Sequence, residues 1–386
     1  WEQRKLGDLY KRVNERNDGT LGRDKWISVA KMYFQDPDKV QSNNLDTRTY
    51  VMKKGDIAFE GHPNNEFKFG RFVLNDIGTG IISELFPIYR PITEYDLDFW
   101  KYAIQLERVM APILAKSITS SGNSSNKLDH NHFLNKELLV PNIEEQKKIG
   151  TLLSLLSKNI TLHQCKLKKL NLAKKSLLQK LFPRNGSQIP GVRFKGFTDA
   201  WEQRKLGDLA EIVRGASPRP ISDSKWFDNN SDVGWLRISD VTAQDGRIQY
   251  LEQKISKLGQ DKTRVVKTPH LLLSIAATVG KPVINYVPTG VHDGFLIFLN
   301  PKFNILYAFW WLEIFREEWN KYGQPGSQVN LNSDLVKNQV INIPNEKEQE
   351  KISSFLEALD RIITLHQRKL ERLQEVKKGL LQKMFV

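Results

Sequence analysis

Two segments of the chain occur twice and form a repeated frame. Each copy of the frame encloses a different sequence. The segment WEQRKLGDL occupies residues 1–9 and returns, letter for letter, at 201–209. A second segment, 141–182, returns with fewer identities at 344–385, whereas the residues between these segments differ almost completely. An internal repeat has to be settled before a fold is assigned, because each copy is a structural unit. The pattern indicates one task performed twice on two different targets.

The segments 141–182 and 344–385 are predicted to be long helices. Apolar residues recur in both at spacings of three and four, which is typical of a helical stripe close to a heptad seam. Asn142 and Asn345 are predicted N-caps, since a glutamate three residues later can reach back to each. About 40 residues at 1.5 Å per residue give a length of roughly 60 Å. One apolar stripe on so long a helix needs a partner, and we expect the two copies to pair antiparallel.

The segments between the repeats are predicted to be globular. Both contain short β-rich runs broken by Gly, Pro and Asn, followed by an aromatic helical stretch. We therefore expect an α+β fold with a pseudo-two-fold internal repeat, in which two mixed α/β domains are separated by the helix pair, like a dumbbell. The predicted strands are 26–29, 56–59, 81–89, 235–238, 271–276 and 294–299, and the aromatic helices are 97–110 and 305–319. The predicted parts are a first domain at 1–141, a spacer helix at 142–182, a linker at 183–200, a second domain at 201–343 and a second spacer helix at 344–386.

Charge and composition restrict the partners of the chain. A net charge of +14 over 386 residues favours an anionic partner such as nucleic acid. The excess lies mainly in residues 143–182, which carry nine basic and two acidic side chains, so a nucleic-acid surface on the variable regions must be a local patch. The single cysteine, Cys165, fits a reduced, cytoplasmic chain, and no apolar run is long enough to span a bilayer. Residues 191–200 have no counterpart before Trp1, so we expect the natural N-terminus to be longer.

Signatures of catalysis and of metal binding are mostly missing from the sequence. It has no phosphate-binding Gly-x-x-x-x-Gly-Lys-Ser/Thr loop, no His-Glu-x-x-His and no paired cysteines. The tetrad Asn300-Pro301-Lys302-Phe303 loosely resembles the Asn-Pro-Pro-aromatic motif of amino-methyltransferases. Its third position departs from the motif and no glycine-rich cofactor loop accompanies it, so a turn after a strand is the better interpretation. We therefore predict no catalytic residue, no metal site and no cofactor bound by this chain.

Two loops rich in Gly, Ser, Asn and Gln, at 120–127 and 323–332, lie just before the long helices. Such residues let backbone amides approach phosphates and offer donors and acceptors to base edges. The loop 214–220 and the turn 278–281 are similar, and in each case a solvated surface loop is the alternative interpretation. The candidate DNA-binding residues, including surface charges of the first half, are Lys11, Arg12, Arg16, Lys31, His62, Asn64, Asn65, Lys68, Asn123, Ser124, Asn126, Lys127, Arg214, Ser217, Arg219, Thr278, Lys281, Gln324, Ser327, Gln328, Asn330 and Asn332.

The frame segments resemble a known family. The duplicated WEQRKLGDL, the lead-in RFKGFTDAWEQRKL, and EEQKKI or KEQEKI before a long helix containing TLHQ are similar to the specificity subunit of type I restriction–modification enzymes. The resemblance covers essentially the whole chain and implies two target recognition domains, each reading one half of a bipartite double-stranded DNA sequence. Since the two halves differ here, the expected target is asymmetric.

The resemblance also implies partner proteins. The paired helices would set the spacing between the half-sites and dock methyltransferase subunits, two in number, and restriction/translocase subunits would join through the complex. Catalysis, with S-adenosylmethionine, ATP and Mg²⁺, would belong to those partners. Two other hypotheses remain open at this point: a non-catalytic coiled-coil scaffold whose globular ends bind proteins, and a self-contained DNA methyltransferase, for which the sequence shows no cofactor site.

Overall fold

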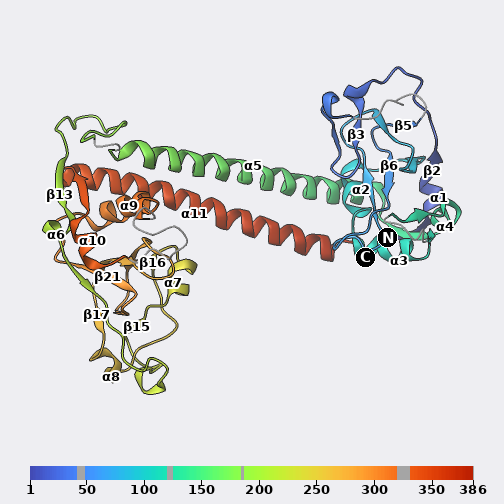
Figure 1. The fold of residues 1–386 in the computed structure, drawn as a ribbon. Helices are drawn as coiled ribbons and strands as arrows, with labels where there is room; N and C mark the ends of the chain where they lie inside the picture. Colours follow the sequence, from blue (N-terminus) through green and yellow to red (C-terminus); the bar gives the residue numbers. More distant parts are fainter. Residues whose placement is uncertain (41–47, 120–124, 184–186, 320–330, 386) are drawn as a thin grey trace. The chain divides into compact units, whose positions relative to one another are not determined.

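The fold is described by a computed structural model that covers residues 1–386 except 41–47, 120–124, 184–186, 320–330 and 386 (Figure 1). Contacts divide the chain into two compact units. The first unit is Trp1–Cys165 with Gln367–Val386, and the second unit is Lys166–His366. Each unit therefore combines one globular region with the beginning of one long helix and the end of the other.

The two long helices are α5 (Ile143–Leu181) and α11 (Glu346–Lys383). The predicted N-caps are confirmed: Asn142 Oδ1 accepts a hydrogen bond from the backbone N–H of Glu145 at 2.9 Å, and Asn345 Oδ1 accepts one from that of Glu348 at 3.0 Å. Each cap satisfies a backbone donor that the first helical turn leaves without an intrahelical acceptor. The two glutamate side chains, expected to reach back to the caps, bind tryptophans instead.

Each copy of WEQRKLGDL forms a short strand followed by one helical turn. The strand pairs antiparallel with the strand that leads into the long helix of its own repeat, which explains why these two sequence segments recur together. In the first unit, β1 (Glu2–Lys5) and α1 (Leu6–Leu9) accompany β12 (Glu137–Val140), and in the second unit β13 (Glu202–Lys205) and α6 (Leu206–Leu209) accompany β22 (Val340–Ile343).

The tryptophan that opens each copy binds a glutamate in the first turn of the long helix. Trp1 Nε1 donates to Glu145 Oε1 at 3.0 Å, and Trp201 Nε1 donates to Glu348 Oε2 at 3.2 Å. In the second unit Arg193 adds two charge-assisted bonds to the same carboxylate, each of 2.7 Å. The repeated frame therefore anchors the start of each helix to the adjacent strand pair.

Within each unit, one long helix begins where the other ends. In the first unit, the Tyr102 hydroxyl donates to the backbone oxygen of Leu153 near the start of α5 at 3.2 Å, and Lys377 near the end of α11 lies 4.9 Å from the Tyr102 ring centroid. In the second unit, Lys174 near the end of α5 binds Asp360 in the first half of α11. The helix segments in each unit are therefore antiparallel.

Besides the β1-β12 pair, the described residues of the first unit form an antiparallel sheet of order β2-β9-β6-β7 and the two-stranded pairings β3-β4, β5-β8 and β10-β11. Helices α2 and α3 and the helix ends pack on the sheet around Trp100, Phe99 and Phe133. The strands are β2 (Tyr10–Val13), β3 (Ile27–Ser28), β4 (Tyr33–Phe34), β5 (Thr49–Met52), β6 (Ile57–Glu60), β7 (Arg71–Leu74), β8 (Gly80–Ser83), β9 (Ile88–Pro91), β10 (Ile118–Thr119) and β11 (Lys127–Leu128). The helices are η1 (Arg23–Lys25), η2 (Pro37–Lys39), α2 (Leu97–Ala103), α3 (Glu107–Ala115) and α4 (His130–Leu134).

The second unit contains a five-stranded sheet of order β14-β21-β18-β19-β16 and a three-stranded sheet of order β15-β20-β17. The aromatic helix α9 packs on the larger sheet, together with the end of α5 and the start of α11. The strands are β14 (Glu211–Arg214), β15 (Gly234–Trp235), β16 (Arg247–Ile248), β17 (Arg264–Val266), β18 (Leu271–Ser274), β19 (Pro282–Asn285), β20 (Thr289–Val291) and β21 (Phe295–Leu299). The helices are η3 (Ser224–Trp226), α7 (Ile238–Ala243), α8 (Lys257–Gln260), α9 (Ile305–Phe315) and α10 (Ser333–Asn338).

The expected α+β class is confirmed, and several predicted elements differ in detail. The aromatic helix predicted at 305–319 ends at Phe315. The strand predicted at 81–89 is two strands, β8 and β9, because a turn closed by Phe86 N–H bonding to Ser83 O separates them. The strand predicted at 235–238 ends at Trp235, since Asp240 accepts a bond from Arg237 N–H and starts α7. The helix predicted at 97–110 is broken into α2 and α3, with extended backbone at Leu106.

No helix among the described residues combines the length and the apolarity needed to cross a bilayer. The same residues bring together no group of three His, Cys, Asp or Glu side chains that could hold a metal ion.

Candidate nucleic-acid interface

In the first unit, two candidate loops meet beside a groove with a volume of about 570 Å³. The backbone N–H of Asn126 donates to Gly61 O at 2.8 Å, so the loop before α4 is attached to the loop after β6. A Cβ on Gly61 would lie 2.1 Å from Asn126 O, so this approach requires glycine. The structure therefore brings three candidates, His62, Asn126 and Lys127, into one groove.

The floor of this groove carries a histidine that is held by a buried tyrosine. His130 Nδ1 lies 2.6 Å from the hydroxyl of Tyr89. Burial, together with the positive charge of Arg12, lowers the pKa of His130. A neutral imidazole has one donor and one acceptor nitrogen, so His130 is suited to polar recognition at neutral pH.

The candidate Arg16 lies on the loop that follows β2. Its Nη2 is 3.3 Å from Glu84 Oε2, and its guanidinium carbon is 5.4 Å from the centroid of the Tyr50 ring. Glu84 also lines the groove, beside Leu85, whose side chain is highly exposed. Arg16 therefore reaches the edge of the groove through its ion pair with Glu84.

The remaining candidates of the first unit lie on exposed surface. Lys11, Arg12, Lys31 and Asn65 are all exposed. Asn64 Oδ1 accepts hydrogen bonds from the backbone N–H groups of Glu66 and Phe67 and so shapes its own turn. The ammonium of Lys68 lies 5.4 Å from the ring centroid of Phe69.

In the second unit, the candidates Ser217 and Arg219 line a groove of about 690 Å³. Trp235, Ile221 and Ile238 supply its apolar walls, and Arg237, His292 and Asp293 supply further polar groups. Arg237 is held by two carboxylates, through bonds of 2.8 Å to Asp240 and 3.1 Å to Glu252. The groove combines aromatic, apolar and charged walls, as sites for nucleic-acid bases do.

Asp293 organises the loop that carries Arg214, Ser217 and Arg219. Its carboxylate accepts bonds from Ser217 Oγ at 2.7 Å and from Arg219 Nη2 at 3.3 Å. Its backbone oxygen accepts a bond of 2.6 Å from Arg214 Nε. The hydrogen bond from Ser217 lowers the pKa of Asp293, whereas burial lowers the pKa of the adjacent His292. At neutral pH the loop is therefore hydrogen-bonded to the charged carboxylate of Asp293, which lies beside the neutral imidazole of His292.

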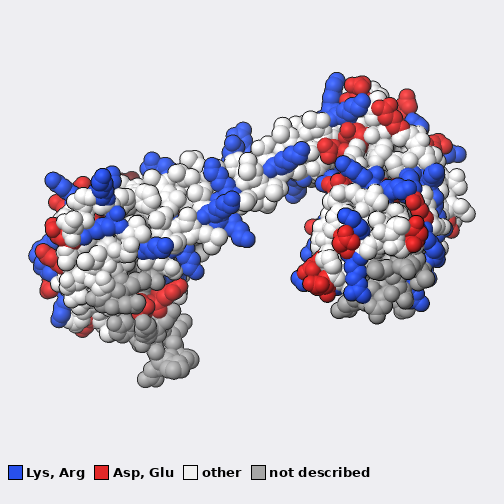
Figure 2. Space-filling view, turned by 90° about the horizontal axis from the view of Figure 1, so that it is seen from above, with Lys and Arg blue, Asp and Glu red and all other residues white. Residues whose placement is uncertain are grey.

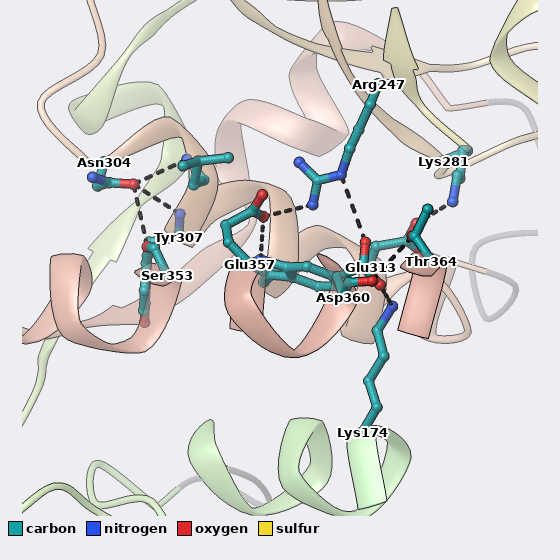
Figure 3. Close-up of polar contacts among 12 residues, drawn as sticks. Lys174, Arg247, Lys281, Asn304, Tyr307, Glu313, Ser353, Glu357, Asp360 and Thr364 are labelled. Carbon is teal, nitrogen blue, oxygen red and sulfur yellow. Dashed lines mark hydrogen bonds and ion pairs between the residues drawn. The ribbon is translucent and has the colours of Figure 1, made fainter. Parts of the chain in front are cut away.

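The other second-half candidates with described positions have local structural partners. Lys281 binds Glu313 and lies 2.6 Å from Asp245 (Figure 3). Burial acts to lower the pKa of Lys281, but the two carboxylates outweigh it and raise the pKa. Asn332 Oδ1 caps α10 through Leu335 N–H at 2.9 Å, and Thr278 Oγ1 donates to Ser274 Oγ at 3.2 Å. Lys281 in particular fits a structural role.

A polar network fixes the start of α11 and the end of α5 in the second unit (Figure 3). Glu357 Oε1 accepts bonds of 2.6 Å from Arg247 and 3.0 Å from Trp310, and Lys174 binds Asp360 one turn further along α11. This network could not be predicted from residue spacing, because its residues come from four distant segments.

Figure 2 shows basic and acidic side chains interspersed on the surfaces of both units, as expected from the near-balanced charge of the variable regions. Basic side chains predominate along the visible helix surface.

Several groove residues were missed by the sequence analysis. His130, Glu84, Trp235, Arg237, His292 and Asp293 carry no motif, and each joins a groove through contacts between distant strands and loops. The six candidates Asn123, Ser124, Gln324, Ser327, Gln328 and Asn330 lie outside the described residues.

Comparisons with known proteins find a family match in the second half of the chain and relatives along its whole length. Residues 198–375 match the family described as type I restriction modification DNA specificity domain. The type I restriction enzyme MjaVIII specificity subunit of Methanocaldococcus jannaschii is 24% identical over 406 residues, which cover 99% of this chain and 91% of that protein.

Two solved structures share the fold. The S subunit of a type I restriction–modification system from M. genitalium is similar with a TM-score of 0.58 and 13% identity, covering 100% of this chain and 96% of that one. The HsdS subunit from Thermoanaerobacter tengcongensis is similar with a TM-score of 0.52 and 18% identity, over 100% and 96% of the two chains.

Proposed function

We propose that this chain is a specificity subunit of a type I restriction–modification system, in which each globular region reads one half of an asymmetric, bipartite DNA target. The proposal rests on the contrast between the repeated frame and the variable regions that it encloses. The strand pair and the tryptophan–glutamate bond are the same in both units, whereas the two grooves have different walls. One scaffold thus presents two different reading surfaces.

Physical chemistry gives a reason for two readers on one chain. A good bidentate contact to a base edge contributes about 1–3 kcal/mol of discrimination, so a domain that reads a few base pairs has limited specificity alone. Two covalently joined domains add their energies and require both half-sites at one spacing. Half-sites roughly 34 Å apart, one turn of the duplex, would lie on the same face of the DNA.

Catalysis is assigned by this proposal to partner chains. S-adenosylmethionine, ATP and Mg²⁺ would be used there, in the methyltransferase and restriction/translocase subunits. The proposal is supported by the sequence, which carries no phosphate-binding loop and no complete amino-methyltransferase tetrad. The specificity subunit then supplies recognition and geometry only.

The proposed docking surface for two methyltransferase subunits is the apolar face that the long helices leave exposed. Leu155 and Leu162 of α5 are 56% and 63% exposed in the first unit, and Leu172 and Leu365 are 60% and 59% exposed in the second. Large apolar side chains repeated along a helix are typical of a protein interface. Replacing Leu155 and Leu162 by glutamate is expected to abolish co-purification with the methyltransferase, whereas glutamate at the exposed polar neighbours Lys158 and Gln164 should not.

The most informative test is the pattern of methylated bases in DNA from a cell that carries this chain and its partners. A split motif with two unlike halves is expected. Exchanging residues 201–343 for the corresponding region of another specificity subunit should change one half of that motif and leave the other unchanged. If both halves change, the assignment of one half-site to each domain is wrong.

A second variant tests the spacing role of the helices. One added helical turn in both α5 and α11 lengthens each by ~5.4 Å. At about 3.4 Å per base pair, the unread gap should widen by about one or two base pairs with both half-sites unchanged. Altered half-sites at the old gap would refute this role. Failure of the wild-type complex to select any sequence from a random duplex pool would instead favour a protein-binding scaffold.

A further inference from the structure

Both units place an arginine and a carboxylate at the same point of the fold, although the sequences around them are unrelated. In each unit the strand that follows the WEQRKLGDL segment pairs antiparallel with a later strand, β2 with β9 and β14 with β21. The arginine, Arg16 or Arg219, lies on the loop after the first strand. The carboxylate, Glu84 or Asp293, lies on the segment just before the second. The guanidinium-to-carboxylate distance is 3.3 Å in both units.

In the second unit both members of the pair line the groove, whereas in the first unit Arg16 reaches the groove through its ion pair with Glu84. Glu84 lines the groove of the first unit, and Arg219 and Asp293 line that of the second. Two unrelated sequences have therefore placed the same two functional groups at equivalent positions. The variable regions are where the two half-sites must be distinguished, so a shared arrangement there points to a shared step in recognition.

The loop that carries Arg219 is fixed by hydrogen bonds of Gly215 and Ser217. Gly215 N–H donates to Phe295 O at 2.9 Å, and a Cβ on Gly215 would lie 2.1 Å from His292 O. Ser217 Oγ donates to the Asp293 carboxylate at 2.7 Å and accepts a bond from the Asp293 N–H at 3.3 Å. Because both roles of this hydroxyl are used inside the protein, Ser217 is suited to position the loop and not to bind DNA.

The arginine side chains themselves are well exposed. Arg219 is 83% exposed and Arg16 is 53% exposed, so water screens both ion pairs strongly and each contributes little to stability. The Arg219 guanidinium can therefore exchange its carboxylate for another acceptor at low cost, whereas Arg16 also lies against Tyr50, 5.4 Å from the centroid of its ring. Arg237, in the same groove as Arg219, is less available because Asp240 and Glu252 both bind it.

Arginine has a chemistry that suits this position. Its planar fork of donors matches the O6 and N7 acceptors of guanine in the major groove, which is the commonest base-specific contact of DNA-binding proteins. Lysine carries the same charge but cannot reproduce the two parallel bonds. A carboxylate held beside the guanidinium orients the fork before DNA arrives and reduces the conformational freedom lost on binding.

We propose that Arg16 and Arg219 each read a guanine, one in each half-site, and that Glu84 and Asp293 are the residues that position them. The inference rests on the proposed function, because it assumes that each groove faces one half-site. It assigns base reading to two of the described candidates and a supporting role to Ser217.

The test uses the full-length chain assembled with its methyltransferase subunits and selection from a random-sequence duplex pool. Arg219→Lys is expected to lower the preference for one G·C pair of the second half-site by roughly 5- to 150-fold, with the first half-site unchanged. Arg16→Lys should do the same in the first half-site. Binding to non-specific duplex and its salt dependence should be unchanged, since the charge is retained. Melting temperatures of the variants establish that they fold.

The positioning role has its own measurement. Asp293→Asn and Glu84→Gln should weaken the preference at the same base pair as the respective arginine variant without shifting it to another position. The control is Lys225→Ala, which removes an exposed basic group of the second unit that pairs with Asp223 at 2.8 Å and should leave the selected sequence unchanged.

The outcomes separate the inference from the function on which it rests. If the wild-type complex selects a bipartite motif and the lysine variants select it with undiminished preference, the inference is wrong and the proposed function stands. Loss of preference in both half-sites from a single variant also overturns the inference. If the wild-type complex selects no motif, the proposed function itself fails.

Discussion

The carboxylate of Glu348 anchors the second copy of the frame, and replacing it by glutamine should loosen that anchor selectively. Glu348 is 1% exposed and Arg193 is 13% exposed, and two bonds of 2.7 Å join them. The same carboxylate accepts the indole N–H of Trp201. Glu348→Gln preserves size and shape but removes the negative charge opposite a largely buried guanidinium.

The first repeat supplies a matched control. Glu145 is only partly buried, and its side chain accepts a 3.0 Å bond from Trp1 as its counterpart does from Trp201, but no arginine bond to it accompanies that contact among the described residues. Removing one partner of a buried ion pair costs about 3–5 kcal/mol, whereas losing one ordinary hydrogen bond costs about 0.5–1.5 kcal/mol. We therefore expect Glu348→Gln to destabilise its strand pair by at least about 1.5 kcal/mol more than Glu145→Gln destabilises the other.

Native-state hydrogen exchange measures this difference locally, which matters because a chain of two units need not unfold in one step. The peptides to follow are Glu202–Lys205 with Val340–Ile343, and Glu2–Lys5 with Glu137–Val140. Since about 1.4 kcal/mol is a factor of ten, exchange in the second strand pair should accelerate by roughly two orders of magnitude in Glu348→Gln. Exchange in the first pair should not change. Equal acceleration in the two glutamine variants would refute the argument that the buried arginine pair makes the second anchor stronger.

The remaining predictions concern packing, a structural lysine and pH. Gly215→Ala should lower the melting temperature, because its Cβ would lie 2.1 Å from His292 O, whereas Gly379→Ala in α11, with nothing within 4 Å, should raise stability by about 0.5–1 kcal/mol. Lys281→Ala should cost about 1–3 kcal/mol of unfolding free energy by leaving Glu313 without its ammonium, yet leave the selected DNA sequence unchanged, and a changed half-site would show that Lys281 contacts DNA. Burial lowers the pKa of His292 in the fold, so the unfolded chain takes up the proton first and stability should fall as the pH drops below about 6.5. Thermal melts at pH 7.5 and 5.5 check this, and the drop should be smaller in His292→Asn.

Periodicity and repetition predicted the parts of the fold that depend on local rules. The long helices follow from apolar residues at helical spacing and from Asn142 and Asn345, whose caps need only the next helical turn. The recurrence of Trp1 and Trp201 indicated a duplicated unit, and the structure supplies the reason, which is the bond from each indole to the first turn of a long helix.

Predictions from local sequence were wrong where pairing with a distant strand decides where an element ends. The run 81–89 is mostly apolar and was predicted as one strand, but it forms two strands with different partners. β8 pairs with β5, and β9 pairs with β2 and β6. The strand predicted at 235–238 ends at Trp235, where its pairing with the distant strand β20 stops, and α7 begins at Ile238. Neither partner choice is visible in residue spacing.

Repeats, helical periodicity and caps are properties of neighbouring residues, and they were enough to identify a duplicated α+β chain with two long helices, a shared frame and two unlike globular regions. Which of the many surface charges lie together depends on the folded chain. Folding brought Arg16 to Glu84 and Arg219 to Asp293, and it engaged Lys281 in a partly buried ion pair with Glu313. The reason is that a charge acquires its role from the groups within a few ångströms of it, and strand pairing, not chain order, selects those groups.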